Sequence, residues 1–213
     1  MLERIWYVPE LIYFYNGSST SSSGNGTMLL ERDKIANGSG TALTSMYAAW
    51  VFCYNLQSLD ISELYTPNVA NLSCAFEYCK KLEYIDVSHF NTAKVTTISY
   101  MFDYCQRLKE LDLRTWNTEK LTGNGLTYTF RYCYALKKIL GLENFYTNNL
   151  TSLVSTFNTC YSLENLSGII NWNTSNITSL NSTFASCHKI KILNLKNWDI
   201  SKVTNIGAIF SNC

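Results

Sequence analysis

Hydrophobic positions recur along this chain with a period of 26 to 28 residues. Each period contains an aromatic residue, two further residues and then a cysteine, which we call the frame aromatic and the frame cysteine. In chain order these pairs are Trp50/Cys53, Phe76/Cys79, Phe102/Cys105, Phe130/Cys133, Phe157/Cys160, Phe184/Cys187 and Phe210/Cys213. A fixed period of this length is typical of proteins built from stacked repeats, in which each repeat packs only against its neighbours.

Two shorter periodicities lie within each repeat. Apolar residues alternate after the frame cysteine, as in Leu82–Val87 and Ile190–Leu195, and this pattern predicts a half-buried strand. From Val95 to Cys105 the apolar spacing is three and four, which predicts a short helix or 3-10 turn. Inserted residues near Gly141 and Gly168 fall inside the predicted strands, where glycine suits a bulge or tight turn.

We therefore predict an α/β repeat solenoid. Its form is a leucine-rich-repeat horseshoe, with one short parallel strand and one short helix or 3-10 turn per coil of 26–28 residues. Residues 41–213 hold about seven such coils. Residues 1–40 lie outside the clear repeat and are predicted to be an N-terminal cap or anchor segment. Within them, residues 16–27 are rich in Ser, Gly, Thr and Asn, a composition typical of a flexible linker.

The repeat resembles a known pattern. The string Met101-Phe102-x-x-Cys105-x-x-Leu108-x-x-Leu111-Asp112-Leu113-x-x-Trp116-Asn117-Thr118 is similar to the repeat of BspA-like leucine-rich-repeat surface proteins. It is most similar to the variant found in mycoplasma lipoprotein-associated repeats. The resemblance covers about residues 41–213. It implies surface display, adhesion to host proteins, matrix or other cells, and neither catalysis nor a cofactor.

Composition narrows the classes of partner. Charged residues are 15% of the chain and the net charge is +1, without the clustered Lys and Arg that nucleic-acid binding requires. No apolar run reaches the roughly 18 residues of a membrane span. The first ten residues lack the pattern of a secretory signal, so a virion is an alternative to the extracellular or cell-surface location that the resemblance implies. Fifteen tyrosines suit a binding surface, because tyrosine supplies contact area at low entropy cost.

The cysteines and acidic residues give no sign of a metal or catalytic site. Seven of the eight cysteines occupy one frame position, and equivalent side chains on stacked coils point in parallel. That geometry is poor for disulfides, so we expect buried free thiols. Asp60, Asp86 and Asp112 should form a column whose carboxylates, about 5 Å apart, could attract calcium. We expect instead that each accepts hydrogen bonds from neighbouring residues. No catalytic motif or zinc-ligand spacing occurs.

The exposed side of the predicted sheet is the candidate binding face. Its residues are Ser58, Asp60, Tyr84, Asp86, Ser88, Glu110, Asp112, Arg114, Lys138, Asn194 and Lys196. We predict a non-enzymatic module that binds a protein or glycan on a cell or particle surface through this face. The alternative is a structural or decoration component of a larger particle, a phage virion or cell-surface assembly, anchored by residues 1–40. The last coil has no polar capping unit after it, which predicts an end-to-end or assembly contact there.

Overall fold

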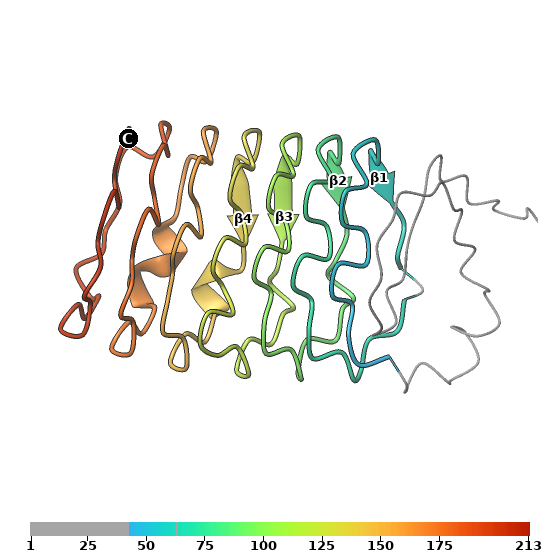
Figure 1. Cartoon of the computed structure of the whole chain (residues 1–213), viewed down its shortest axis with the longest axis horizontal. Helices are drawn as coiled ribbons and strands as arrows, with labels where there is room; N and C mark the ends of the chain where they lie inside the picture. The colour runs from blue at the N-terminus through green and yellow to red at the C-terminus, as the bar shows by residue number, and fades with distance from the viewer. Residues whose placement is uncertain (1–42, 63) are drawn as a thin grey trace, which may run out of the picture.

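The computed structural model describes residues 43–62 and 64–213, which form coils stacked side by side in a row (Figure 1). The predicted cap or anchor segment and its linker lie outside the described residues. The strands are β1 (Ser58–Leu59), β2 (Tyr84–Ile85), β3 (Glu110–Asp112) and β4 (Lys138–Leu140). β1 pairs with β2, and β3 with β4, in parallel and in register. The predicted repeat fold is confirmed, whereas its horseshoe curvature stays a prediction.

The core is a column of frame aromatics, one from each coil. Trp50, Phe76, Phe102, Phe130, Phe157 and Phe184 are at most 1% exposed. Consecutive rings in the column lie nearly parallel, with interplanar angles of 4° to 12° and centroids 4.9 to 6.1 Å apart. A single coil therefore supplies one layer of this core, and the layers above and below complete its packing.

Of the predicted short helix or 3-10 turn in each coil, the helix is wrong, and turns closed by i→i+3 bonds take its place. Among the described residues there is no α-helix, and the two 3-10 segments, η2 (Leu142–Asn144) and η3 (Ser167–Asn171), lie elsewhere in their coils. The segment predicted as helical is a run of turns. In the third coil it is closed by i→i+3 backbone bonds, in which Met101 N–H donates to Ile98 and Cys105 N–H to Phe102. These four residues are buried at spacings i, i+3, i+4 and i+7, a burial pattern that an amphipathic helix shares.

Left-handed backbone makes this run of turns possible. Two non-glycine residues in every coil have φ between 52° and 62°, and they occupy the third position of a turn, where a type II turn takes positive φ. Each costs about 1–2 kcal/mol for an L-residue. The residues are Ala48, Phe52, Cys74, Tyr78, Tyr100, Tyr104, Tyr128, Tyr132, Ser155, Thr159, Ser182, Ser186, Ala208 and Asn212. In the first six coils, every one donates its own N–H to a carbonyl of the next coil, at 2.7 to 3.1 Å.

The predicted strands form in only part of the stack. Ile190–Leu195 forms no strand, and Ser167 belongs to η3. Inserted glycines accompany both 3-10 segments. Gly141, with φ of 94°, precedes η2, and a Cβ there would lie 2.6 Å from the Arg114 backbone nitrogen. Glycine is therefore required at this crossing between coils.

The frame cysteines link neighbouring coils without disulfides. All eight cysteines are thiols that form no disulfide bond, and all of them lie within the described residues. The Cys133 thiol donates to the Phe102 carbonyl at 3.1 Å, and Cys160 to Phe130 at 3.0 Å. Burial raises the pKa of both thiols well above the ordinary value. The expectation of buried free thiols is confirmed for most of the frame, while Cys213 is exposed.

The ring column makes a first testable prediction. Phe130→Ala should lower the free energy of unfolding by about 3–5 kcal/mol, because it leaves a cavity between two stacked rings. Phe210, which is 49% exposed, provides the matched control, and its replacement by Ala should cost much less. Urea unfolding followed by tryptophan fluorescence measures both. Equal losses would show that the column does not form the core.

Thiol reactivity makes a second prediction. A maleimide should label Cys213 rapidly in the native protein, because this thiol is exposed. Cys105, Cys133 and Cys160 should stay unlabelled until urea unfolds the chain, because only the thiolate reacts and burial raises their pKa. Peptide mapping by mass spectrometry locates the label, and a Cys213→Ser variant checks the rapid phase. Fast native labelling of the three buried thiols would contradict the fold.

Candidate binding surfaces

The strands bring the first part of the predicted binding face together. Ser58 lies opposite Tyr84 in β1 and β2, and Glu110 lies opposite Lys138 in β3 and β4. All four side chains are exposed, whereas the next residue in each strand points toward the core. The Lys109 N–H donates to the Glu83 carbonyl at 3.3 Å and continues the ladder between the two pairs.

Of the remaining predicted residues, Asp112 ends β3, and the others follow the strands or lie beyond them. Asp60, Asp86 and Arg114 are exposed, and Ser88 and Asp112 are half-buried. Asn194 and Lys196 are also exposed, but they lie outside any strand, beyond a coil whose strand position belongs to η3. The described structure therefore groups the candidate face around β1–β4, and it does not extend the sheet to the last two residues.

The aspartate column has its hydrogen-bond partners within the chain. The Asp86 carboxylate accepts the Ser88 N–H at 2.9 Å, and Asp112 accepts the Arg114 N–H at 3.1 Å and its guanidinium at 2.6 Å. Bonds from Ser88 hold the pKa of Asp86 below its usual range, and those from Arg114 do the same for Asp112. The hydrogen-bonding expectation is confirmed. Within the described residues, no group of three or more His, Cys, Asp or Glu is arranged to hold a metal ion.

A second surface, the tyrosine face, was not predicted. It is formed by five half-buried tyrosines with left-handed backbone, Tyr78, Tyr100, Tyr104, Tyr128 and Tyr132. Ring centroids lie 4.4 Å apart for Tyr78–Tyr104, 4.2 Å for Tyr104–Tyr132 and 4.5 Å for Tyr100–Tyr128. Because the ring faces cover one another, this surface offers mainly ring edges and hydroxyl groups to solvent.

A buried ion pair lies beneath these rings. Arg131 donates to both carboxylate oxygens of Asp103, at 3.0 and 2.6 Å. The Asp103 side chain is fully buried and that of Arg131 is 24% exposed. The guanidinium carbon is 4.6 Å from the ring centroid of Tyr128 and 5.2 Å from that of Tyr132. The pair therefore joins the third and fourth coils through both charge and cation–π contact.

The sequence did contain a signal for this surface. The residue two places after the frame aromatic is Phe52, Tyr78, Tyr104 and Tyr132 in the first four coils. Aligning the repeats by this position shows an aromatic column. The left-handed backbone that places these rings has no signature in residue type, because tyrosine is not among the residues that favour positive φ.

The chain can now be compared with known proteins. The sequence profile of the family described as "Mycoplasma protein of unknown function, DUF285" matches residues 41–137 and 124–213. This chain belongs to that family. The match confirms the resemblance of its repeat to the mycoplasma type of BspA-like leucine-rich repeat. A search of curated proteins finds no match to the chain.

Solved structures that are similar to this chain include those of two leucine-rich proteins. A leucine-rich repeat protein from Eubacterium ventriosum ATCC 27560 is 18% identical with a TM-score of 0.43, over 74% of this chain and 43% of that protein. A leucine rich cell surface protein from Faecalibacterium prausnitzii A2-165 is 17% identical with a TM-score of 0.30, over 80% and 61%. The chain thus spans less than two thirds of either protein. In the described residues, no helix has the length and apolar character needed to cross a membrane.

The buried carboxyl group makes a third prediction. Burial, with a smaller contribution from the charge of Glu77, raises the pKa of Asp103 to about 6 against the opposing effect of Arg131. An unfolded aspartate titrates near about 3.9, so the folded protein binds this proton more tightly. The stability that this tighter proton binding contributes is fully present below about pH 4 and is lost as the pH rises through about 6.

Urea unfolding of the native protein and of Asp103→Asn across this range measures the effect. The free energy of unfolding of the native protein should fall relative to the variant as the pH rises from 4 to 6.5, because the variant has no proton to lose. A difference that stays constant with pH would show that Arg131 keeps the carboxylate ionised throughout.

Proposed function

We propose that this protein is a non-enzymatic binding module that recognises a protein or glycan on a cell surface through the exposed face of β1–β4. The family resemblance, which implies surface display and adhesion, supports this proposal and an extracellular or cell-surface location. Stacked coils also hold their side chains on a rigid and extended platform, which suits recognition of a large partner.

The observation that carries the proposal is a contrast between neighbouring positions. The residues that point inward, Leu59, Ile85, Leu111 and Ile139, are aliphatic in all four strands. The outward residues at the preceding position are a serine, a tyrosine, an acid and a base. Packing does not require this diversity. Tyr84 is 63% exposed, and an exposed tyrosine on a rigid strand is a favourable anchor for a partner.

The absence of catalysis is part of the proposal. General acid catalysis at neutral pH needs a carboxyl group with a raised pKa, whereas Asp86 and Asp112 on this face have lowered values. Asp103 has a raised pKa, but its side chain is fully buried beneath the tyrosine face and bound to Arg131.

The particle-component alternative depends on residues 1–40, which lie outside the described residues, so no structural observation favours it. For the end-to-end contact we note that Ile206 and Phe210 of the last coil are 59% and 49% exposed. Either an assembly contact or a further coil would bury these two side chains.

A double substitution tests the binding face. The full chain is applied to immobilised extracellular-matrix proteins and to a glycan array, and affinity is measured for each probe that binds. Tyr84→Ala combined with Asp86→Lys should weaken binding at least tenfold, because it removes an aromatic anchor and reverses a charge at the centre of the face.

The matched control carries the same changes at exposed sites away from the strands, Tyr146→Ala with Glu119→Lys. Both variants should keep the native melting temperature. Equal affinities of the two variants would exclude the strand face, and a failure of the native chain to bind any probe would argue against adhesion.

A further inference from the structure

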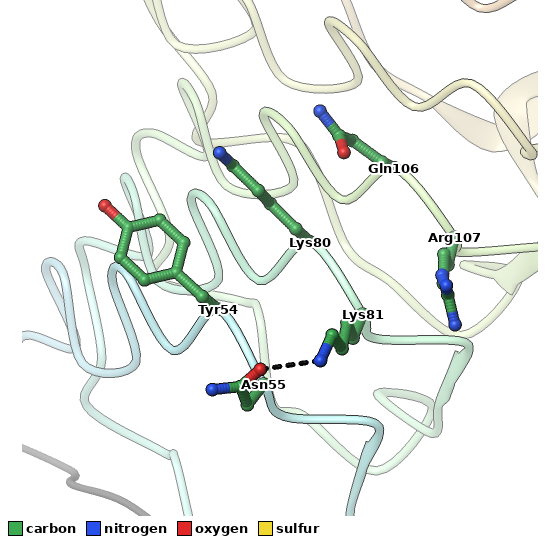
Figure 2. Close-up of a pocket in the computed structure, with 6 residues that line it drawn as sticks. All are labelled: Tyr54, Asn55, Lys80, Lys81, Gln106 and Arg107. Carbon is green, nitrogen blue, oxygen red and sulfur yellow. Dashed lines mark hydrogen bonds between the residues drawn. The ribbon is translucent and has the colours of Figure 1, made fainter.

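The turn that follows the frame cysteine forms a third surface, whose chemistry differs from that of the strand face and the tyrosine face. An open depression of about 470 Å³ is lined by the first and second residues after this cysteine in three successive coils. These residues are Tyr54, Asn55, Lys80, Lys81, Gln106 and Arg107. We call this surface the basic edge. Figure 2 shows Tyr54, Lys80 and Gln106 extending in the same direction from neighbouring coils.

The basic edge has three cations and no lining carboxylate. Lys81 donates to the Asn55 side-chain oxygen at 2.7 Å, and a lysine ammonium has two further donors. Lys80 lies over the rings of Tyr54 and Tyr78, with its nitrogen 5.1 and 5.6 Å from their centroids.

The carboxylate that approaches this edge has another partner. An oxygen of Glu83 is 3.8 Å from Arg107, but the other accepts a hydrogen bond from Lys109 at 2.7 Å. Among the described residues, neither Lys80 nor Lys81 has a carboxylate within ion-pair distance. The described residues therefore compensate the positive charge of the edge only in part.

Positive charge is concentrated in this part of four of the first six coils. The five residues after each of the first six frame cysteines contain eight of the chain's seventeen Lys and Arg residues and only three Glu. The chain as a whole has a net charge of +1. At the far ends of β1, β2 and β3, the column of Asp60, Asp86 and Asp112 has the opposite sign. An anionic ligand is thus attracted to the edge and repelled from that column.

The chemistry of the edge suits a sugar chain that carries acid groups. Lys and Arg bind carboxylate and sulfate groups, the Gln106 amide can pair with hydroxyl groups, and the exposed Tyr54 ring offers an apolar surface to a sugar ring. The depression is open and runs across three coils, so it fits an extended polymer better than an enclosed small molecule.

We propose that the basic edge binds an acidic polysaccharide, with Lys80, Lys81 and Arg107 holding its carboxylate or sulfate groups. This site shares no residue with the strand face, which it adjoins through Glu83, and does not depend on the partner of that face. An acidic protein segment is the competing ligand, and the experiment below separates the two.

The test uses the full chain and four probes: heparin, hyaluronate, neutral dextran and poly-L-glutamate. Calorimetry should show binding of heparin or hyaluronate that weakens as salt is added, and none of dextran. The triple variant Lys80→Gln, Lys81→Gln, Arg107→Gln should lose at least tenfold in affinity for the acidic polysaccharide. It should keep its melting temperature, because these side chains lie on the surface.

The control variant removes the same charge elsewhere. Lys94→Gln, Lys120→Gln and Lys202→Gln change three exposed lysines that occupy one position of the repeat, remote in sequence from the cysteine turn, and should leave the affinity within about twofold. The proposal is overturned if neither acidic polysaccharide binds, or if both triple variants lose affinity equally. It is also overturned if poly-L-glutamate binds more tightly than both polysaccharides and shows the same dependence on the three cations.

Discussion

The backbone hydrogen bonds between the turns of neighbouring coils are the interaction on which this structure depends. Alternate N–H groups along each run of turns point to the next coil, as when Phe102 donates to Thr129 and Tyr104 to Arg131. Two residues per coil must be left-handed for this to happen. That conformation is unfavourable for an L-residue in isolation, and in the first six coils the hydrogen bonds to the next coil offset its cost.

The buried polar side chains obey the same constraint. The Thr92 hydroxyl accepts the N–H of Asn117 in the next coil at 2.8 Å, and the Trp116 indole donates to Val87 of the preceding coil at 3.0 Å. The frame thiols donate across coils in the same way. A buried polar group without a partner costs about 1–3 kcal/mol. These residues therefore favour stacking in register, since any shift would leave them unpaired.

Register also explains how the surfaces arise. The three surfaces described above are columns, each built from two or three positions of the repeat. Within each surface, successive coils place different residues at the same position. At one position of the basic edge, for example, these residues are Tyr54, Lys80 and Gln106. A rigid stack allows these positions to vary freely, because the core residues between them stay the same.

Much of this protein could be predicted from its sequence alone. The period, the frame aromatics, the buried thiols and the positions of β1–β4 follow from local patterns of apolar residues, which depend only on which side chains are buried. The conformation of the turns could not be predicted, because burial at Ile98, Met101, Phe102 and Cys105 fits a helix as well as a run of turns. Only tertiary structure decides between them, since the acceptors for the left-handed N–H groups lie in another coil. The Asp103–Arg131 pair and the grouping of cations at the basic edge were decided in the same way, by contacts between residues about one repeat apart.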